Sequence, residues 1–142
     1  MAAEKQPQQT ITVPQLKYLR TMERNKYTQL AKRKRMATRL MGENKIVKES
    51  LKELVEGNKD TIIPLGAGIY VQGSIASKSF KRTLPGNVVI ASTKEEIEKE
   101  LTERDKLYAQ DLTILDKELL ETRKALESMN ALLQMARNKQ QK

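Results

Sequence analysis

The chain lacks the residue types that catalytic and metal sites use most often. Its 142 residues include no Cys, no His and no Trp, and its aromatic residues are one Phe and four Tyr. Without Cys there is no disulfide, no thiolate nucleophile and no cysteine zinc site. Without His the commonest general base and transition-metal ligand are missing, which excludes Ser-His-Asp and Cys-His mechanisms. Chemistry based on Asp, Glu, Lys or Tyr remains open, but we find no catalytic constellation of these residues. We therefore expect a protein that is not an enzyme and that uses no cofactor and no metal.

Long apolar runs are also missing. Aromatic residues make up 4% and charged residues 32% of the chain, a composition that suits extended helices better than a spherical core. No stretch approaches the ~20 consecutive apolar residues of a membrane span. The first residues contain no apolar segment of the kind found in secretory signals. We therefore expect a soluble, cytoplasmic protein.

The N-terminal part predicts a tail followed by one long helix. Residues 1–13 are polar and rich in Gln, which predicts disorder. Thr12 is a suitable cap, Pro14 suits a first turn and Gly57 supplies a stop signal, so we expect a helix over 14–56. A seven-residue repeat runs through positions 16, 23, 30, 37, 44 and 51 and through positions 19, 26, 33, 40, 47 and 54. Eight of these twelve positions are apolar.

The C-terminal part predicts a second helix with a cleaner repeat. Ser92 or Thr93, followed three positions later by acidic residues, forms a capping-box pattern, so we expect a helix over 92–139. Nine of twelve seam positions, from 98 and 101 to 133 and 136, are apolar. A 3.5-residue period of this length is typical of a coiled coil. We expect the two helices to pair antiparallel, with the numbers of facing residues adding up to about 150.

The segment between the helices predicts two β-hairpins over 57–91. Residues 61–65 and 68–75 are rich in β-forming residues and flank a Gly-Ala-Gly turn. Residues 78–84 and 87–91 flank a Pro-Gly turn, in which Pro presets φ and Gly accepts a positive φ. Alone, this insert would expose sheet edges and apolar side chains. We infer that it is an assembly module that other copies or partners complete.

The predicted fold is α+β, a long antiparallel two-helix coiled coil joined by two β-hairpins, with 14–142 as one domain. This layout closely resembles the alpha class of prefoldin. The most specific match is 62–75, IIPLGAGIYVQGSI, which resembles the first hairpin of the family. The TVPQL sequence of 12–16 resembles the start of the eukaryotic alpha-class subunit numbered five. The chain as a whole also resembles the archaeal alpha subunit. The segment 78–84 is more polar than the third strand usual in the family.

The resemblance implies an ATP-independent co-chaperone subunit. Prefoldins are heterohexamers of two alpha-class and four beta-class subunits, joined through β-barrels built from the hairpins. Their coiled-coil tips hold unfolded proteins, notably actin and tubulin, and deliver them to the cytosolic group II chaperonin. An alpha-class paralogue in a prefoldin-like scaffold complex is an alternative. The expected assembly residues are Ile62, Ile63, Leu65, Ile69, Val71, Ile75, Val88, Val89 and Ile90.

Apolar residues at the far end of the helices are candidates for client binding. A two-stranded seam needs only two of every seven positions, and some of these residues fall outside it. Met is flexible and common on promiscuous binding surfaces. The alternative is that these residues only widen the contact between the helices or that the ends fray. The candidates are Leu16, Leu19, Met22, Leu126, Met129, Leu132, Leu133 and Met135.

The net charge of +9 is concentrated on the first helix. Segment 14–56 carries +7 and segment 93–142 carries −1, and the densest basic run is Lys32–Arg35. This run has three interpretations: ion pairs with acidic residues of 111–121, a nuclear import signal that would add a nuclear fraction, or contacts with phosphates. A basic coiled-coil protein that binds nucleic acid is therefore the second functional hypothesis. Its weakness is that such a protein needs no hairpins.

Overall fold

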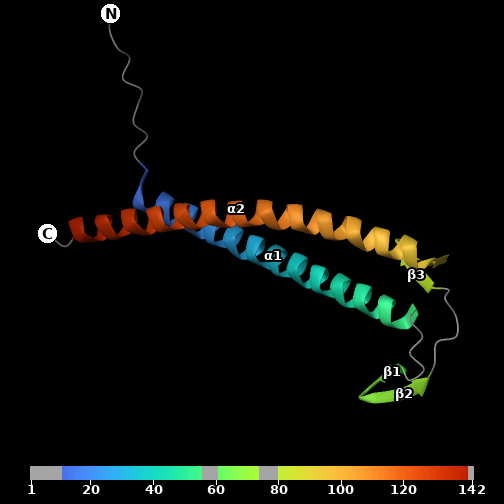
Figure 1. Ribbon diagram of the computed structural model, residues 1–142. Helices are drawn as coiled ribbons and strands as arrows, with labels where there is room; N and C mark the ends of the chain where they lie inside the picture. The colour runs from blue at the N-terminus through green and yellow to red at the C-terminus, as the bar shows by residue number, and fades with distance from the viewer. Residues whose placement is uncertain (1–10, 56–60, 74–79, 141–142) are drawn as a thin grey trace, which may run out of the picture. The chain divides into compact units, whose positions relative to one another are not determined.

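The computed structural model describes residues 11–55, 61–73 and 80–140 (Figure 1). Two helices and two two-stranded antiparallel sheets define an α+β fold, in agreement with the fold class that the sequence predicts. Neither described helix has the length and hydropathy of a membrane-spanning segment. The elements in chain order are α1 (Val13–Val55), β1 (Thr61–Gly66), β2 (Ile69–Gly73), β3 (Phe80–Leu84), β4 (Val88–Ser92) and α2 (Lys94–Gln140).

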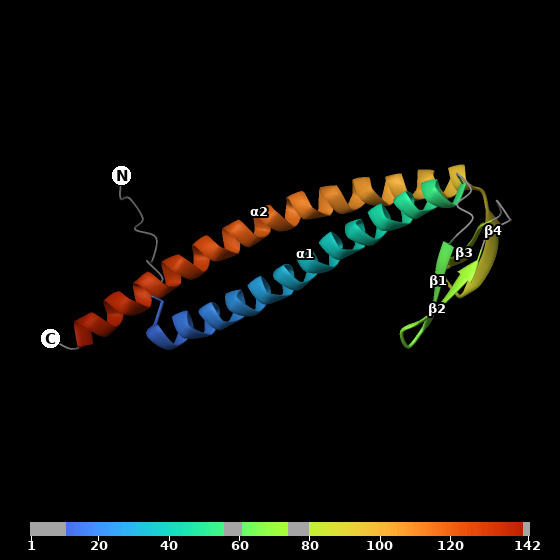
Figure 2. The same cartoon turned by 60° about the horizontal axis from the view of Figure 1, so that its bottom comes forward.

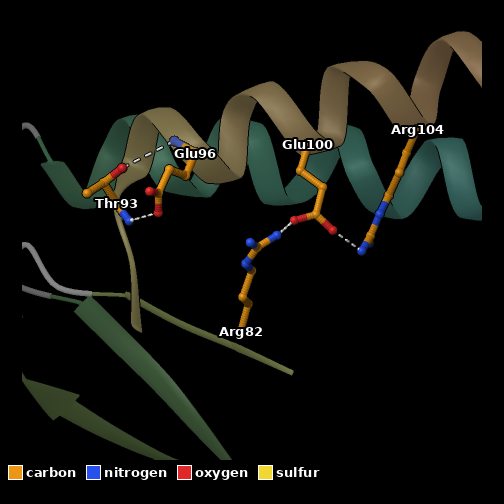
Figure 3. A network of polar contacts seen from close by, with 5 residues as sticks. All are labelled: Arg82, Thr93, Glu96, Glu100 and Arg104. Atoms are coloured by element: carbon orange, nitrogen blue, oxygen red, sulfur yellow. Dashed lines mark hydrogen bonds and ion pairs between the residues drawn. The ribbon is translucent and has the colours of Figure 1, made fainter. Parts of the chain in front are cut away.

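Both helices begin with a reciprocal capping box. The Thr12 N–H donates to Oε1 of Gln15 at 3.0 Å, and the Gln15 N–H donates back to Thr12 Oγ1 at 3.4 Å. At α2 the Thr93 N–H donates to Oε2 of Glu96 at 3.0 Å, and the Glu96 N–H donates to Thr93 Oγ1 at 3.3 Å (Figure 3). These bonds satisfy N–H groups that the first helical turn leaves without partners. Thr93 is therefore the cap, and Ser92 ends the preceding strand instead of opening the helix.

The chain divides into two compact units, which we describe separately. The terminal unit consists of 1–36 and 112–142, and the hairpin unit consists of 37–111. In both units α1 and α2 lie side by side and run in opposite directions (Figure 2).

In the terminal unit the helices share a seam of buried leucines. Leu16 and Leu30 of α1 and Leu115 and Leu133 of α2 are buried. The predicted seam of α2 is confirmed, because every predicted position from 112 to 136 is buried or half-buried. On α1 the set that contains Leu16 is confirmed, whereas positions 19, 26 and 33 are exposed. Two of those three positions carry a charge, and the helix instead half-buries positions 20 and 34.

Two polar contacts between the helices show the register of this seam. Nη1 of Arg20 donates to Oδ1 of Asn130 at 3.4 Å, and Nζ of Lys34 lies 2.5 Å from Oδ1 of Asp116. Both pairs match the prediction that the numbers of facing residues add up to about 150.

In the hairpin unit the seam between the helices contains a cluster of polar residues. Its apolar core contains buried Ala37 and Leu51 on α1 and Leu101 on α2. Asn44, which is also buried, donates from Nδ2 to Oδ1 of Asp105 at 2.9 Å. The other carboxylate oxygen of Asp105 lies 2.5 Å from Nζ of Lys48. These hydrogen bonds, from Lys48 and then Asn44, hold the pKa of Asp105 below its usual value against the opposing effect of burial.

The two predicted hairpins are confirmed, together with their turn chemistry. In β1–β2, Ile63 pairs with Val71, and the turn residues Ala67 and Gly68 have φ of 49° and 76°. Positive φ at both residues is the mark of a type I′ turn, whose twist suits a hairpin. In β3–β4 the pairing closes at Leu84 and Val88, and the turn between them has positive φ at Gly86 and Asn87.

An ion-pair network connects the second hairpin with α2. The guanidinium group of Arg82 on β3 pairs with Glu100, and Glu100 also pairs with Arg104 one turn later (Figure 3). The Arg82 and Glu100 side chains are only 33% and 26% exposed, so water screens this pair less than a surface pair. The network holds β3 against the first turns of α2.

We expect Thr122→Val to stabilise the chain. Thr122 is 2% exposed, and its hydroxyl has no hydrogen-bond partner among the described residues. Val has nearly the same shape without the unsatisfied oxygen, so the unfolding free energy should rise by about 1 kcal/mol. Denaturant unfolding followed by circular dichroism measures this change. Thr102→Val is the matched control, because the exposed Thr102 hydroxyl donates to the Glu98 carbonyl and should give no gain. A loss of stability in Thr122→Val would contradict the assignment.

We expect Asp105→Asn to reduce stability at neutral pH and to lose this effect in acid. The folded-state pKa of Asp105 lies below its unfolded value of 3.8, so its contribution is present above about pH 4 and is lost as the pH falls through the folded pKa. At pH 7 the variant should be less stable by about 1–2 kcal/mol. The difference from wild type should shrink toward about pH 3 in denaturant titrations. Exposed Asp111→Asn is the control, and a difference for Asp105→Asn that does not vary with pH would contradict the prediction.

Candidate functional site

The sequence-predicted assembly residues of the first hairpin are exposed on both faces of the sheet. Alternation along the strands puts Ile63, Ile69 and Val71 on one face and Ile62 and Tyr70 on the other. Ile62, Ile69 and Tyr70 are 66%, 60% and 63% exposed. The predicted residue Ile75 lies outside the described residues, and the side chain of Leu65 does as well.

The second hairpin has one face that is half-buried and one that is exposed. Phe80, Arg82 and Ile90 point to the half-buried face, on the side of the Arg82–Glu100 ion pair. Val89 points to the other face and is 58% exposed, and Val88 at the strand end is 54% exposed. A two-stranded hairpin is marginally stable alone, and its unpaired edges and exposed apolar residues are typical of a surface that another strand or sheet covers.

The eight predicted tip residues separate into two groups. Four belong to the seam between the helices, where Leu16 and Leu133 are buried and Leu126 and Met129 are half-buried. The other four are 41–61% exposed and form what we call the apolar flank: Leu19, Met22, Leu132 and Met135.

The four members of the apolar flank lie along one edge of the terminal unit. Met22 and Leu132 each stand one position before a seam residue, and in an antiparallel pair these positions border the same edge. Leu19 lies one turn before Met22, and Met135 lies one turn after Leu132, so each helix contributes a row of two residues. Tyr18, which is 65% exposed, lies beside this flank.

The opposite edge carries a groove that the sequence reasoning missed. This basic groove has a volume of about 350 Å³. Each residue that lines the groove follows a seam residue by one or by four positions. Such positions border the edge that lies opposite the apolar flank. The available signal was the spacing of 20, 24 and 27, which puts three long side chains on one helix edge. The lining residues are Arg20, Arg24, Tyr27, Leu126 and Asn130.

The basic run Lys32–Arg35 is only partly neutralised by α2. Lys34 pairs with Asp116, as the ion-pair interpretation predicts. The side chains of this pair are 43% and 56% exposed, so it contributes little stability. Lys32, Arg33 and Arg35 are exposed and make no ion pair within the described ranges. Within the same ranges, no group of acidic side chains is arranged to hold a metal ion.

No protein-family model matches the chain, and no curated protein matches it. The arrangement of two helices and two hairpins is compatible with a prefoldin-like fold. We therefore infer the function from the exposed surfaces of this chain.

We expect substitutions in the two groups of tip residues to have different effects on stability. Leu16→Gln with Leu133→Gln should lower the unfolding free energy by roughly 2 kcal/mol or more, because a polar amide replaces a buried side chain. Changing all four residues of the apolar flank to Gln should have little effect on stability but should reduce binding of a hydrophobic dye. Thermal unfolding and dye fluorescence measure the two effects. Equal destabilisation by both variants would show that the flank belongs to the core.

Proposed function

We propose that the chain is an alpha-class subunit of a prefoldin-like co-chaperone that holds unfolded proteins without using ATP. The observation that carries this proposal is the pair of exposed apolar surfaces, one on the hairpins and one on the terminal unit. The apolar flank lies outside the seam that pairs the helices, and an exposed apolar patch in a protein commonly serves an interaction. The order of helix, two hairpins and helix supports the same conclusion.

The hairpins serve assembly in this proposal. Closure of hairpins from several subunits into a β-barrel would bury one face of β1–β2, either that of Ile62 and Tyr70 or that of Ile69. A barrel also pairs the free strand edges, which removes the tendency to aggregate. The partners are beta-class prefoldin subunits in a heterohexamer.

The apolar flank serves client binding. Two of its members are methionines, whose flexible and polarisable side chains fit clients of varied shape. The clients are unfolded proteins of the actin and tubulin kind, and the recipient is a group II chaperonin in the cytoplasm. Both are implied by the resemblance to prefoldin. The paralogue in a scaffold complex remains the alternative within the family.

Binding of nucleic acid is the second candidate function. The exposed cations Lys32, Arg33 and Arg35 favour it, because unpaired basic side chains neutralise phosphates and release counterions. A steep salt dependence of DNA binding that disappears in Arg33→Gln with Arg35→Gln would support this candidate.

We expect the chain, assembled with beta-class subunits, to suppress aggregation of unfolded actin on dilution from denaturant without ATP. Changing Leu19, Met22, Leu132 and Met135 to Gln should abolish most of this suppression, because the exposed apolar area is removed. Light scattering measures aggregation, and size-exclusion chromatography shows whether the variant still assembles.

The matched control changes four other exposed apolar residues of the helices to Gln: Ile46, Leu107, Ile114 and Leu120. This variant should suppress aggregation as the wild type does. Equal loss in both variants would contradict the assignment of the apolar flank. Assembly without any suppression would favour the scaffold paralogue, and failure to assemble with beta-class subunits would refute the proposed function.

A further inference from the structure

The basic groove on the edge opposite the apolar flank combines cationic, aromatic and aliphatic groups. Arg20, Arg24 and Tyr27 come from α1, and Leu126 and Asn130 come from α2. Its volume of about 350 Å³ is at the small end of the range for ligand pockets. A groove of this size accommodates a short peptide segment rather than a folded surface.

The two arginines of the groove have no carboxylate partner among the described residues. Arg20 donates from Nη1 to the amide oxygen of Asn130, at the long distance of 3.4 Å. Glu127, the nearby acid on α2, is engaged by Arg123 at 3.0 Å. Two guanidinium groups are therefore available, and their planar donors match the two oxygens of a carboxylate.

Glu23 does not neutralise these arginines. It occupies a seam position, is half-buried, and its Oε2 atom is buried without a hydrogen-bond partner among the described residues. Its carboxylate is thus directed into the seam. The surrounding segments, 13–31 and 119–140, contain eight Lys or Arg against three Asp or Glu. This excess of positive charge attracts an acidic ligand.

The groove also offers a small apolar contact. Tyr27 is 37% exposed, and Leu126 is half-buried below the edge. An apolar side chain placed against them would lose contact with water, and the Tyr27 ring would provide a flat surface for it.

We propose that the basic groove binds acidic peptide segments in which Asp or Glu stands next to a large apolar residue. The carboxylates pair with Arg20 and Arg24, and the apolar side chain packs on Tyr27 and Leu126. This inference rests on the proposed function and deepens it, because it names the class of client segment that the terminal unit selects. The apolar flank binds apolar segments in general, whereas the groove distinguishes acidic from neutral ones.

Single-stranded nucleic acid is the competing ligand, since Arg and Tyr also contact phosphates and bases. The groove contains only two arginines, which suits isolated carboxylates better than a continuous row of phosphates.

The test is binding of a short fluorescent peptide, in which Glu alternates with Leu and Phe, to the full chain, measured by fluorescence anisotropy. Arg20→Gln with Arg24→Gln should weaken binding about tenfold or more, because two charge-assisted contacts are lost. Tyr27→Ala should weaken binding of this peptide several-fold, but not binding of a peptide with Ser in place of Leu and Phe. A peptide with Gln in place of Glu should bind the wild-type chain about tenfold or more weakly.

Arg33→Gln with Arg35→Gln is the matched control, because it removes the same charge from exposed sites on the same helix. It should change the affinity less than about twofold, as expected for screened, distant charges. Equal loss in both double variants, equal affinity for the Gln peptide, or no binding of the acidic peptide would overturn the inference. So would preferential binding of single-stranded DNA that depends on Arg20 and Arg24. Circular dichroism checks that every variant keeps its helices.

The peptide-binding test and the aggregation test can fail independently of each other. Loss of aggregation suppression in the apolar-flank variant, with no effect of Arg20 and Arg24 on peptide binding, would retain the chaperone proposal and refute the groove. Groove-dependent peptide binding in an assembly that protects no unfolded client would retain the peptide site and refute the chaperone proposal.

Discussion

The register of the two helices determines which side chains line each edge of the helix pair, and in the hairpin unit the cluster of Asn44, Asp105 and Lys48 is the most specific contact that sets it. Leucines in a seam pack almost equally well after a shift of one heptad. A buried amide that donates to a carboxylate at 2.9 Å loses its partner after such a shift. A buried amide without a partner is costly, so the cluster penalises the shifted pairings more than it stabilises the native one. The pair of Lys34 and Asp116 follows the same register in the terminal unit.

The same register separates two chemically different edges. Because Met22 and Leu132 both precede seam residues, antiparallel pairing brings them to one edge. Arg20 and Asn130 both lie four positions after seam residues, and their hydrogen bond marks the other edge. A parallel pairing would mix the two rows on each edge. An apolar edge and a basic edge are therefore a consequence of chain direction as much as of composition.

Local sequence signals predicted much of the fold, but they did not predict which side chains are exposed. Thr12 and Thr93 each stand three residues before a side chain that completes a capping box, so the helix starts could be identified almost to the residue. Pro85-Gly86 predicted a turn, because Pro presets φ and Gly accepts a positive φ. The seam of α2 was predictable because few charges interrupt its repeat. On α1, Lys26 and Arg33 occupy predicted seam positions but are exposed, since the seam turns toward Arg20 and Lys34. The basic groove was missed because none of its residues is unusual alone and only the partner helix supplies Leu126 and Asn130.

The two edges respond in opposite ways to the solution around them. Contacts on the apolar flank depend on the removal of water from Leu and Met side chains, which salting-out ions strengthen. Contacts at Arg20 and Arg24 depend on charge, which salt weakens over the Debye length. A client that touches both edges would therefore keep its apolar attachment at high ionic strength while losing its selection by charge. Because the two edges share no lining residue, a substitution outside the seam can change the selectivity of one edge without altering the other.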